Sequence, residues 1–280
     1  AGVPEVVGVT AARPDGSVHP LKLVAARRAG VQRVFRASGA QALAALAYGT
    51  ETIPRADKVF GPGNLFVTLA KQQLYGQVGI DALYGPTETL VLADEYAASD
   101  LCAADLLAQA EHDVLARPVL ITTTVQHAEA VAAEVERQLG IIERGAIARQ
   151  AIQRGGAVVV DDLDVALGLA NEFAPEHLCL LVENAEALVP RVQNAGGIFV
   201  GEDSPEVLGD YVAGPSHVMP TGGSARFAGP LSVMDFLKVT STIALSAADL
   251  RTIGPAAARL ARAEGLTAHA RSIELRLEGR

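Results

Sequence analysis

Short apolar runs alternate with amphipathic segments along the first part of the chain. The apolar runs predict strands at residues 6–9, 31–35 and 58–60, because short runs bounded by turn residues are typical of strands. The amphipathic segments predict helices at residues 20–29, 41–48 and 65–74. Gly30 and Gly49 follow the first two helices, at the position where glycine commonly ends a helix. Strand–helix–strand order predicts parallel pairing with right-handed crossovers.

A second series of the same kind begins after Gly85. Its apolar runs predict strands at residues 89–93, 118–122, 157–160, 178–182 and 197–200. Helices are expected from residue 100 to about 112 and at residues 126–139, 164–172, 185–194 and 255–263. The chain is therefore expected to be α/β, with two parallel-sheet domains and a helical C-terminal tail. We place the boundaries at 1–84, 85–231 and 232–280.

Composition supports this fold class and narrows the function. Of 280 residues, 50% are hydrophobic and 20% are charged, so a large core is available. A net charge of -9 argues against a nucleic-acid surface. Cys102 and Cys179 lie in apolar runs far apart and are expected to be free thiols, as in a cytoplasmic protein. No apolar run is long enough to cross a membrane, and no signal peptide is recognised. A strand directly after Pro4 suggests missing N-terminal sequence.

A possible metal site lies at the end of the helix that begins near residue 100. Gln109 and His112 are three positions apart, so on a helix they would project from one face. An amide oxygen and an imidazole nitrogen can hold a divalent ion together, and zinc suits such ligands. Two ligands do not make a site, and a polar helix end with an exposed histidine is the ordinary alternative.

Two further patterns carry candidate chemistry. The turn 61–64, Gly-Pro-Gly-Asn, either approaches an anionic group such as a dinucleotide pyrophosphate, or is an ordinary turn with Asn64 as helix cap. Elsewhere, histidines 112, 177, 217 and 269 each stand beside an Asp, a Glu, a Gln or a Pro-Ser turn. Each could be a solvated side chain, but together they are better explained as one site.

The motifs around these residues resemble those of the histidinol dehydrogenase family. They run in the family's order over almost the whole chain: Ser-Gly-Ala-Gln-Ala at 38–42, Phe-Gly-Pro-Gly-Asn at 60–64, Gly-Pro-Thr-Glu at 85–88, Gln-Ala-Glu-His at 109–112, Pro-Glu-His-Leu at 175–178, Gly-Asp-Tyr at 209–211 leading to His217, and Leu-Thr-Ala-His at 266–269. The resemblance implies two incomplete Rossmann-like domains, a homodimer that exchanges its C-terminal tails, one zinc ion per site and NAD as oxidant.

The resemblance also implies roles for single residues. Zinc would be held by Gln109, His112 and Asp210, with His269 from the partner's tail. His177 would be the catalytic base, and Glu176 would activate water. Contacts to the substrate are implied for Thr87, His217 and Glu264, and contacts to NAD for Gln41 and Asn64. The implied reaction takes L-histidinol through the aldehyde to L-histidine, a step of histidine biosynthesis.

Departures from the family pattern keep other functions open. The segment Ala82-Leu83-Tyr84, Thr87 in place of the usual Ser, and Ser216 in place of the usual Asn all touch the expected substrate pocket. The family's N-terminal part, which helps to hold NAD, is absent. A relative that oxidises another small polar alcohol, such as a sulfonated diol, is therefore one alternative. A metal- or nucleotide-binding protein without catalysis is another.

Overall fold

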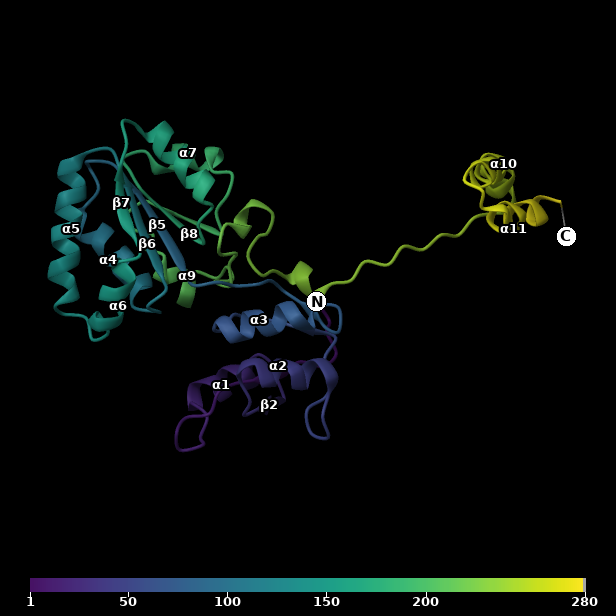
Figure 1. Ribbon diagram of the computed structural model, residues 1–280, viewed down its shortest axis with the longest axis horizontal. Helices are drawn as coiled ribbons and strands as arrows, with labels where there is room; N and C mark the ends of the chain where they lie inside the picture. Colours follow the sequence, from purple (N-terminus) through teal and green to yellow (C-terminus); the bar gives the residue numbers. More distant parts are fainter. Residues whose placement is uncertain (279–280) are drawn as a thin grey trace. The chain divides into compact units, whose positions relative to one another are not determined.

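The computed structural model describes residues 1–278, and contacts divide the chain into two compact units, Ala1–Phe236 and Leu237–Arg280 (Figure 1). The strand–helix alternation expected from the sequence is present through the first unit, and the fold is α/β with parallel sheets. The second unit is helical. Among the described residues, no helix is long and apolar enough to cross a membrane.

The first part of the first unit contains two small parallel sheets. Its elements are β1 (Val7–Val9), α1 (Pro20–Arg28), β2 (Arg33–Phe35), α2 (Gly39–Tyr48), β3 (Lys58–Val59), α3 (Leu65–Leu74) and β4 (Gly79–Ile80). β1 pairs with β2 and β3 pairs with β4, both in parallel. The expected parallel pairing is confirmed. Leu43 and Leu46 of α2 pack with Val59 and Leu74 in a small apolar core.

A five-stranded parallel sheet forms the second part of this unit. Its strands are β5 (Glu88–Ala93), β6 (Arg117–Thr122), β7 (Gly156–Val159), β8 (His177–Leu181) and β9 (Gly197–Val200), in the order β7-β6-β5-β8-β9. All neighbours are parallel. β5 is central and every one of its residues is buried, which fits the apolar run at residues 90–93.

Helices cover both faces of this sheet (Figure 1). On one face, α4 (Ser99–Ala110), α5 (Val125–Leu139) and α6 (Gly145–Ile152) pack over a core that includes Val91 and Ala93. On the other face, α7 (Leu163–Phe173) and α8 (Ala185–Leu188) pack over Leu90 and Leu92. Successive residues of β5 thus point to opposite faces, as the pleat of a strand requires.

The strand order places a topological switch point between β5 and β8, at their carboxyl ends. Open parallel sheets usually bind ligands in the crevice at that point. Here the buried Asp94, which follows β5, lies at this end. Its carboxylate accepts hydrogen bonds from the backbone N–H groups of Tyr96, at 3.0 Å, and Glu183, at 2.8 Å. Asp94 therefore ties the loop after β5 to the loop after β8 across the crevice.

After β9, the first unit ends in short helices: α9 (Val207–Tyr211), η2 (Ser224–Arg226) and η3 (Val233–Phe236). This segment is joined to the strands by several contacts. The N–H of Gly85 donates to Thr221 Oγ1 at 2.6 Å, and Lys58 Nζ donates to the Asp235 carbonyl at 2.6 Å. The rings of Phe60 and Phe236 stack with their centroids 4.1 Å apart.

The second unit is a helical hairpin of α10 (Ala247–Ala263) and α11 (Thr267–Leu277). Ser246 and Asp249 form a capping box at the start of α10, in which each side chain binds the other residue's backbone N–H. Arg262 and Glu274 join the two helices through an ion pair at 2.7 Å.

Several helix boundaries differ from the sequence prediction. The expected helix 185–194 is wrong beyond Leu188, because Pro190 has no N–H to donate to the Glu186 carbonyl, and a short 3-10 turn η1 (Val189–Arg191) follows α8. The helix expected from Pro255 begins earlier, at Ala247, where the capping box stabilises its first turn. No helix was expected at residues 209–211, but this segment lies in α9. α6 and α11 were not predicted.

Candidate active site

His177 is the first residue of β8 and lies beside β5, with Thr89 as its partner in the register. Its Nδ1 is 3.0 Å from the backbone carbonyl oxygen of Glu88. A carbonyl only accepts, so Nδ1 carries the hydrogen and Nε2 holds the free lone pair. Nε2 is buried and has no partner among the described residues. Burial lowers the pKa of His177, so its imidazole is suited to act as a base.

Glu176 precedes His177 and is also buried. Its Oε2 accepts hydrogen bonds from Thr87 Oγ1 at 2.7 Å and from the N–H of Glu88 at 3.2 Å. Burial raises the pKa of Glu176 to about 7, although these two hydrogen bonds act in the opposite direction. A carboxyl group with this pKa can both give and take a proton near neutral pH.

The backbone around Glu176 is held by the neighbouring strand. The carbonyls of Pro175 and Glu176 accept hydrogen bonds from the N–H groups of Gly196 and Gly197, at 2.9 and 2.8 Å. A Cβ on Gly196 would lie 2.6 Å from the Glu176 carbonyl oxygen, so only glycine permits this approach. The Gly196-Gly197 pair therefore fixes the segment that carries the acid and the base.

Gln109 and His112 lie at the carboxyl end of α4. Gln109 is buried, and its Oε1 lies 2.8 Å from Thr87 Oγ1. His112 is exposed and lies two residues beyond Ala110, where α4 ends. The helix expected to reach about residue 112 therefore ends at Ala110, and His112 lies in the turn that follows; the shared face of Gln109 and His112 stays a prediction. The carboxyl end of a helix carries a partial negative charge, which favours a cation beside it.

Electrostatic effects show which further residues face His177. After burial and the Glu88 carbonyl, Asp210 of α9 raises the pKa of His177, whereas His112 and His217 lower it. Asp210 also raises the pKa of Glu176. The structure thus brings Thr87, Gln109, Glu176 and His177 together at the amino ends of β5 and β8, and Asp210, His112 and His217 act on this group electrostatically. Together these residues come from segments spread over more than a hundred positions of the sequence.

Three of these side chains are of the types that zinc binds. Gln109 offers an amide oxygen, His112 an imidazole nitrogen and Asp210 a carboxylate, all of which zinc accepts. Among residues 1–278, no group of three or more His, Cys, Asp and Glu side chains is arranged to hold a metal. Zinc in proteins is usually bound by four ligands, so these three donors would need a fourth. His269 and Glu264 are exposed residues of the second unit, and their proposed approach to this site stays a prediction.

The residues expected to contact NAD, Gln41 and Asn64, lie near the starts of α2 and α3. Asn64 caps α3, since its side-chain oxygen accepts the N–H of Val67 at 3.2 Å. The ordinary interpretation of this turn is thus confirmed, while binding of an anionic group stays a prediction. A Cβ on Gly63 would lie 2.6 Å from the Cβ of Val67, so the turn requires glycine there.

A buried ion pair supports this turn, and nothing in the sequence pattern pointed to it. Lys71 Nζ lies 2.5 Å from Asp81 Oδ1 and 2.6 Å from the Gly61 carbonyl oxygen. Asp81 Oδ2 accepts the N–H of Gly61 at 2.7 Å. Both side chains are 1% exposed. The pair therefore fixes Gly61 between α3 and the segment that leads to Thr87.

A second buried carboxyl, Glu206, was also missed. It is 0% exposed, directly precedes α9 and forms hydrogen bonds with Thr89 Oγ1 and with Cys179 Sγ, the latter at 3.6 Å. Burial raises its pKa to about 8. Its spacing of four positions from Asp210 was the signal that could have found it. Cys102 and Cys179 are both buried free thiols, as expected.

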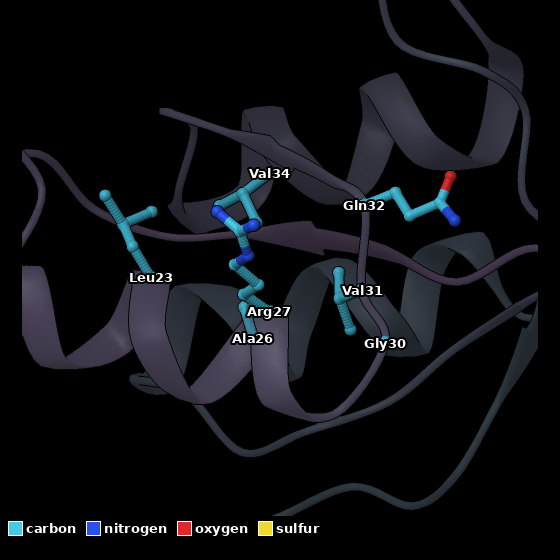
Figure 2. Close-up of a pocket in the computed structure, with 7 residues that line it drawn as sticks. All are labelled: Leu23, Ala26, Arg27, Gly30, Val31, Gln32 and Val34. Carbon is cyan, nitrogen blue, oxygen red and sulfur yellow. The ribbon is translucent and has the colours of Figure 1, made fainter.

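A surface hollow lies elsewhere in the first unit. It measures about 610 Å³ and lies between α1 and the start of β2 (Figure 2), where Leu23, Arg27 and Val31 are among its lining residues. None of the expected site residues lines it. Its form is a shallow groove on the surface, in contrast to the buried surroundings of Glu176 and His177.

The fold and this site define an α/β protein with a buried acid–base pair beside a set of metal-type donors. The family model described as histidinol dehydrogenase matches residues 1–277. The chain belongs to the histidinol dehydrogenase family. This confirms the resemblance seen in the sequence motifs.

Individual relatives agree with this assignment. The chain is 56% identical to the histidinol dehydrogenase of Deinococcus radiodurans over 99% of this chain and 64% of that protein. It is 54% identical to that of Thermus thermophilus over 99% of this chain and 66% of the relative. The crystal structure of histidinol dehydrogenase from Elizabethkingia anophelis matches with a TM-score of 0.91 and 38% identity, over 96% of this chain and 63% of that one. The chain thus spans a little under two thirds of these relatives.

Proposed function

We propose that the protein is a zinc-dependent, NAD-linked dehydrogenase that oxidises L-histidinol to L-histidine by way of the aldehyde. Membership of the family supports L-histidinol as the substrate, because the relatives are named as histidinol dehydrogenases. The observation that carries the proposal is the free, buried Nε2 of His177 beside the carboxyl of Glu176. Oxidising an alcohol requires a base at the hydroxyl, and the second oxidation requires an activated water.

His177 Nε2 would take the hydroxyl proton in the first step, while Nδ1 keeps its hydrogen bond to the Glu88 carbonyl. The hydrogen on carbon leaves as hydride. In the second step, ionised Glu176 would take a proton from water, whose oxygen adds to the aldehyde carbon, and a second hydride leaves. The balance is one alcohol, one water and two NAD to one carboxylate, two NADH and three protons.

The two groups that the chain would bind supply the remaining chemistry. Gln109, His112 and Asp210 of one subunit and His269 of its partner would hold zinc, and Gln41 and Asn64 would contact NAD. Bound zinc would supply polarisation of the substrate, and bound NAD would supply the hydride acceptor. Thr87, His217 and Glu264 would contact the substrate. Because His269 would come from the partner subunit, the proposed working form is a homodimer; the two free thiols fit the proposed location in the cytoplasm.

The proposal is tested by following NADH formation from L-histidinol with the purified full-length protein. We expect turnover that stops on chelation and returns with added zinc, and a fall of about 100-fold to 10,000-fold for His177→Asn, the range for loss of a general base. Metal analysis should give about one zinc per subunit. A protein that folds fully without binding zinc would contradict the metal assignment.

The second candidate is oxidation of another small polar alcohol. Tyr84 and Thr87 depart from the usual family residues. Thr87 contacts Gln109 and Glu176, and the Tyr84 ring is buried, with burial and the nearby Asp81 raising its pKa. A sulfonated diol assayed beside L-histidinol separates the two. Turnover of the diol alone would favour the second candidate.

A further inference from the structure

The hydroxyl of Thr87 joins two groups of the candidate site that come from distant elements. Thr87 Oγ1 lies 2.8 Å from Oε1 of Gln109, near the end of α4, and 2.7 Å from Oε2 of Glu176, just before β8. Thr87 itself directly precedes β5 and is half-buried. Its side chain therefore touches both the proposed metal ligand and the proposed acid.

The number of hydrogens at this bridge is limited. A threonine hydroxyl has one hydrogen to donate, while an amide oxygen and an ionised carboxylate only accept. With Glu176 ionised, Thr87 cannot satisfy both neighbours as donor. One of the two contacts would then place two acceptor oxygens within 2.8 Å, which is repulsive.

Two arrangements remove this conflict. In the first, protonated Glu176 donates to Thr87 Oγ1, and Thr87 donates to Gln109 Oε1. In the second, the Gln109 amide is turned so that its nitrogen donates to Thr87, and Thr87 donates to ionised Glu176. The first arrangement leaves a lone pair of Gln109 Oε1 free for a cation, whereas the second turns that oxygen away from the bridge.

We propose that Thr87 is a positioning residue whose single hydroxyl hydrogen couples the orientation of the Gln109 amide to the Glu176 carboxyl. This inference rests on the proposed function only for its catalytic consequence, because the bridge itself consists of described contacts. When Thr87 donates to Gln109, the amide oxygen is fixed toward the amino ends of the strands. When it donates to Glu176, the carboxylate is stabilised for proton transfer.

The surroundings of Glu176 support the first arrangement as the resting one. The charged and titratable groups that act on Glu176 or on its neighbour His177 are Glu88 of β5, Asp210 of α9, His112 and His217. Glu88 and Asp210 both disfavour ionisation of Glu176, as does burial. Thr87 and the Glu88 N–H are the groups that favour the ionised form.

The test uses variants that differ in the hydroxyl alone. Thr87→Val removes the hydroxyl with little change of shape, Thr87→Ser keeps it, and Thr87→Ala is a second hydroxyl-free variant should the valine protein not fold. The Glu176 carboxyl is followed by ¹³C NMR of glutamate-labelled protein as the pH is changed, with Glu176→Gln identifying its resonance. Zinc affinity and kcat with L-histidinol are measured on the same proteins.

We expect the pH at the midpoint of the Glu176 titration to rise in Thr87→Val and Thr87→Ala, because the Glu176 carboxylate loses a charge-assisted hydrogen bond. Thr87→Ser should match the natural protein. Zinc affinity and kcat should fall on the order of 10-fold to 100-fold in the hydroxyl-free variants, as when a group that supports a metal ligand is removed. A purely structural role would lower thermal stability and leave the midpoint unchanged.

An unchanged midpoint in the hydroxyl-free variants overturns the inference. So does a midpoint that moves equally in Thr87→Ser. A natural protein that neither binds zinc nor oxidises an alcohol would instead contradict the proposed function, while the carboxyl titration still decides the role of Thr87. The two failures are thus distinguishable.

Discussion

Glu176 and His177 respond to burial in opposite directions. Burial raises the pKa of Glu176 to about 7 and lowers that of His177, so each side chain is shifted toward its neutral form. Although Oε2 and Nδ1 are only 3.7 Å apart, the two residues are therefore not a fixed ion pair. The neutral imidazole suits a base, and the carboxyl can exchange its proton near neutral pH.

The shifted pKa of Glu176 predicts a pH-dependent stability. The pKa of Glu176 in the folded protein, about 7, lies above the ordinary value of 4.5. Protonation of Glu176 therefore stabilises the folded protein fully below pH 4.5, and this stabilisation is lost as the pH rises through 7. The free energy of unfolding of Glu176→Gln, measured relative to that of the natural protein, should rise by on the order of 3 kcal/mol between pH 4.5 and pH 8. Urea unfolding of both proteins at several pH values measures this.

In that comparison the contribution of His177 is present in both proteins and largely cancels. Its own pKa is lowered, so its contribution is lost as pH falls below about 6.5, the opposite direction. A stability difference between Glu176→Gln and the natural protein that stays constant with pH would show that Glu176 titrates normally.

The residues of the site differ in how far the sequence could predict them. His177, Glu176 and Gln109 lie where their motifs indicated, because they flank strands and helices with strong apolar patterns. The end of α4 was not predictable, since no glycine or proline follows Ala110. Lys71 and Asp81 were missed because their pairing depends on how α3 packs, which no local pattern records.

Among the elements, α3 depends on its buried ion pair. Removing one partner of such a pair leaves an uncompensated buried charge, which costs about 3–5 kcal/mol. Lys71→Met should therefore lower the free energy of unfolding by about that amount and loosen the turn at Gly61, whose carbonyl Lys71 also binds. Denaturant unfolding measures the loss.

The matched control is an exposed pair of the same charge type. Arg149 lies 3.0 Å from Glu136, and both side chains are more than half exposed. Arg149→Met should cost less than about 1 kcal/mol, as is usual for surface pairs. If the free energy of unfolding fell equally in the two variants, burial of the Lys71–Asp81 pair would not make its loss more costly than that of a surface pair.

Helix α7 contains a glycine that the fold does not require. Gly168 lies in the interior of α7, is exposed, and has no atom within 4 Å of the position where a Cβ would be. Gly168→Ala should stabilise the protein by about 0.5–1 kcal/mol, because alanine loses less backbone entropy in a helix. The melting temperature should rise while activity is unchanged. No rise would show that a Cβ is not accommodated there.

For the whole molecule, the proposed exchange of tails predicts recovery of activity on mixing. His177 belongs to the first unit and His269 to the second. His177→Ala and His269→Ala should each be inactive alone. A mixed dimer has one site that takes its base from one chain and its tail from the other, so that site is intact. NADH formation should return after subunit exchange.

Mixing either variant with itself is the control, and it should stay inactive. If each tail served its own chain, every site in the mixture would lack either His177 or His269. Activity would then not return, and the dimer with exchanged tails would be wrong.

The position of the acid–base pair at the amino ends of β5 and β8 leaves the opposite edge of the sheet free for engineering. The loop at residues 160–162 leaves the carboxyl end of β7, is largely exposed and carries none of the site residues. An affinity tag or a fluorescent reporter could be inserted there before Asp162, which would keep its role as the cap of α7. Such a fusion would label the molecule on the side away from its chemistry.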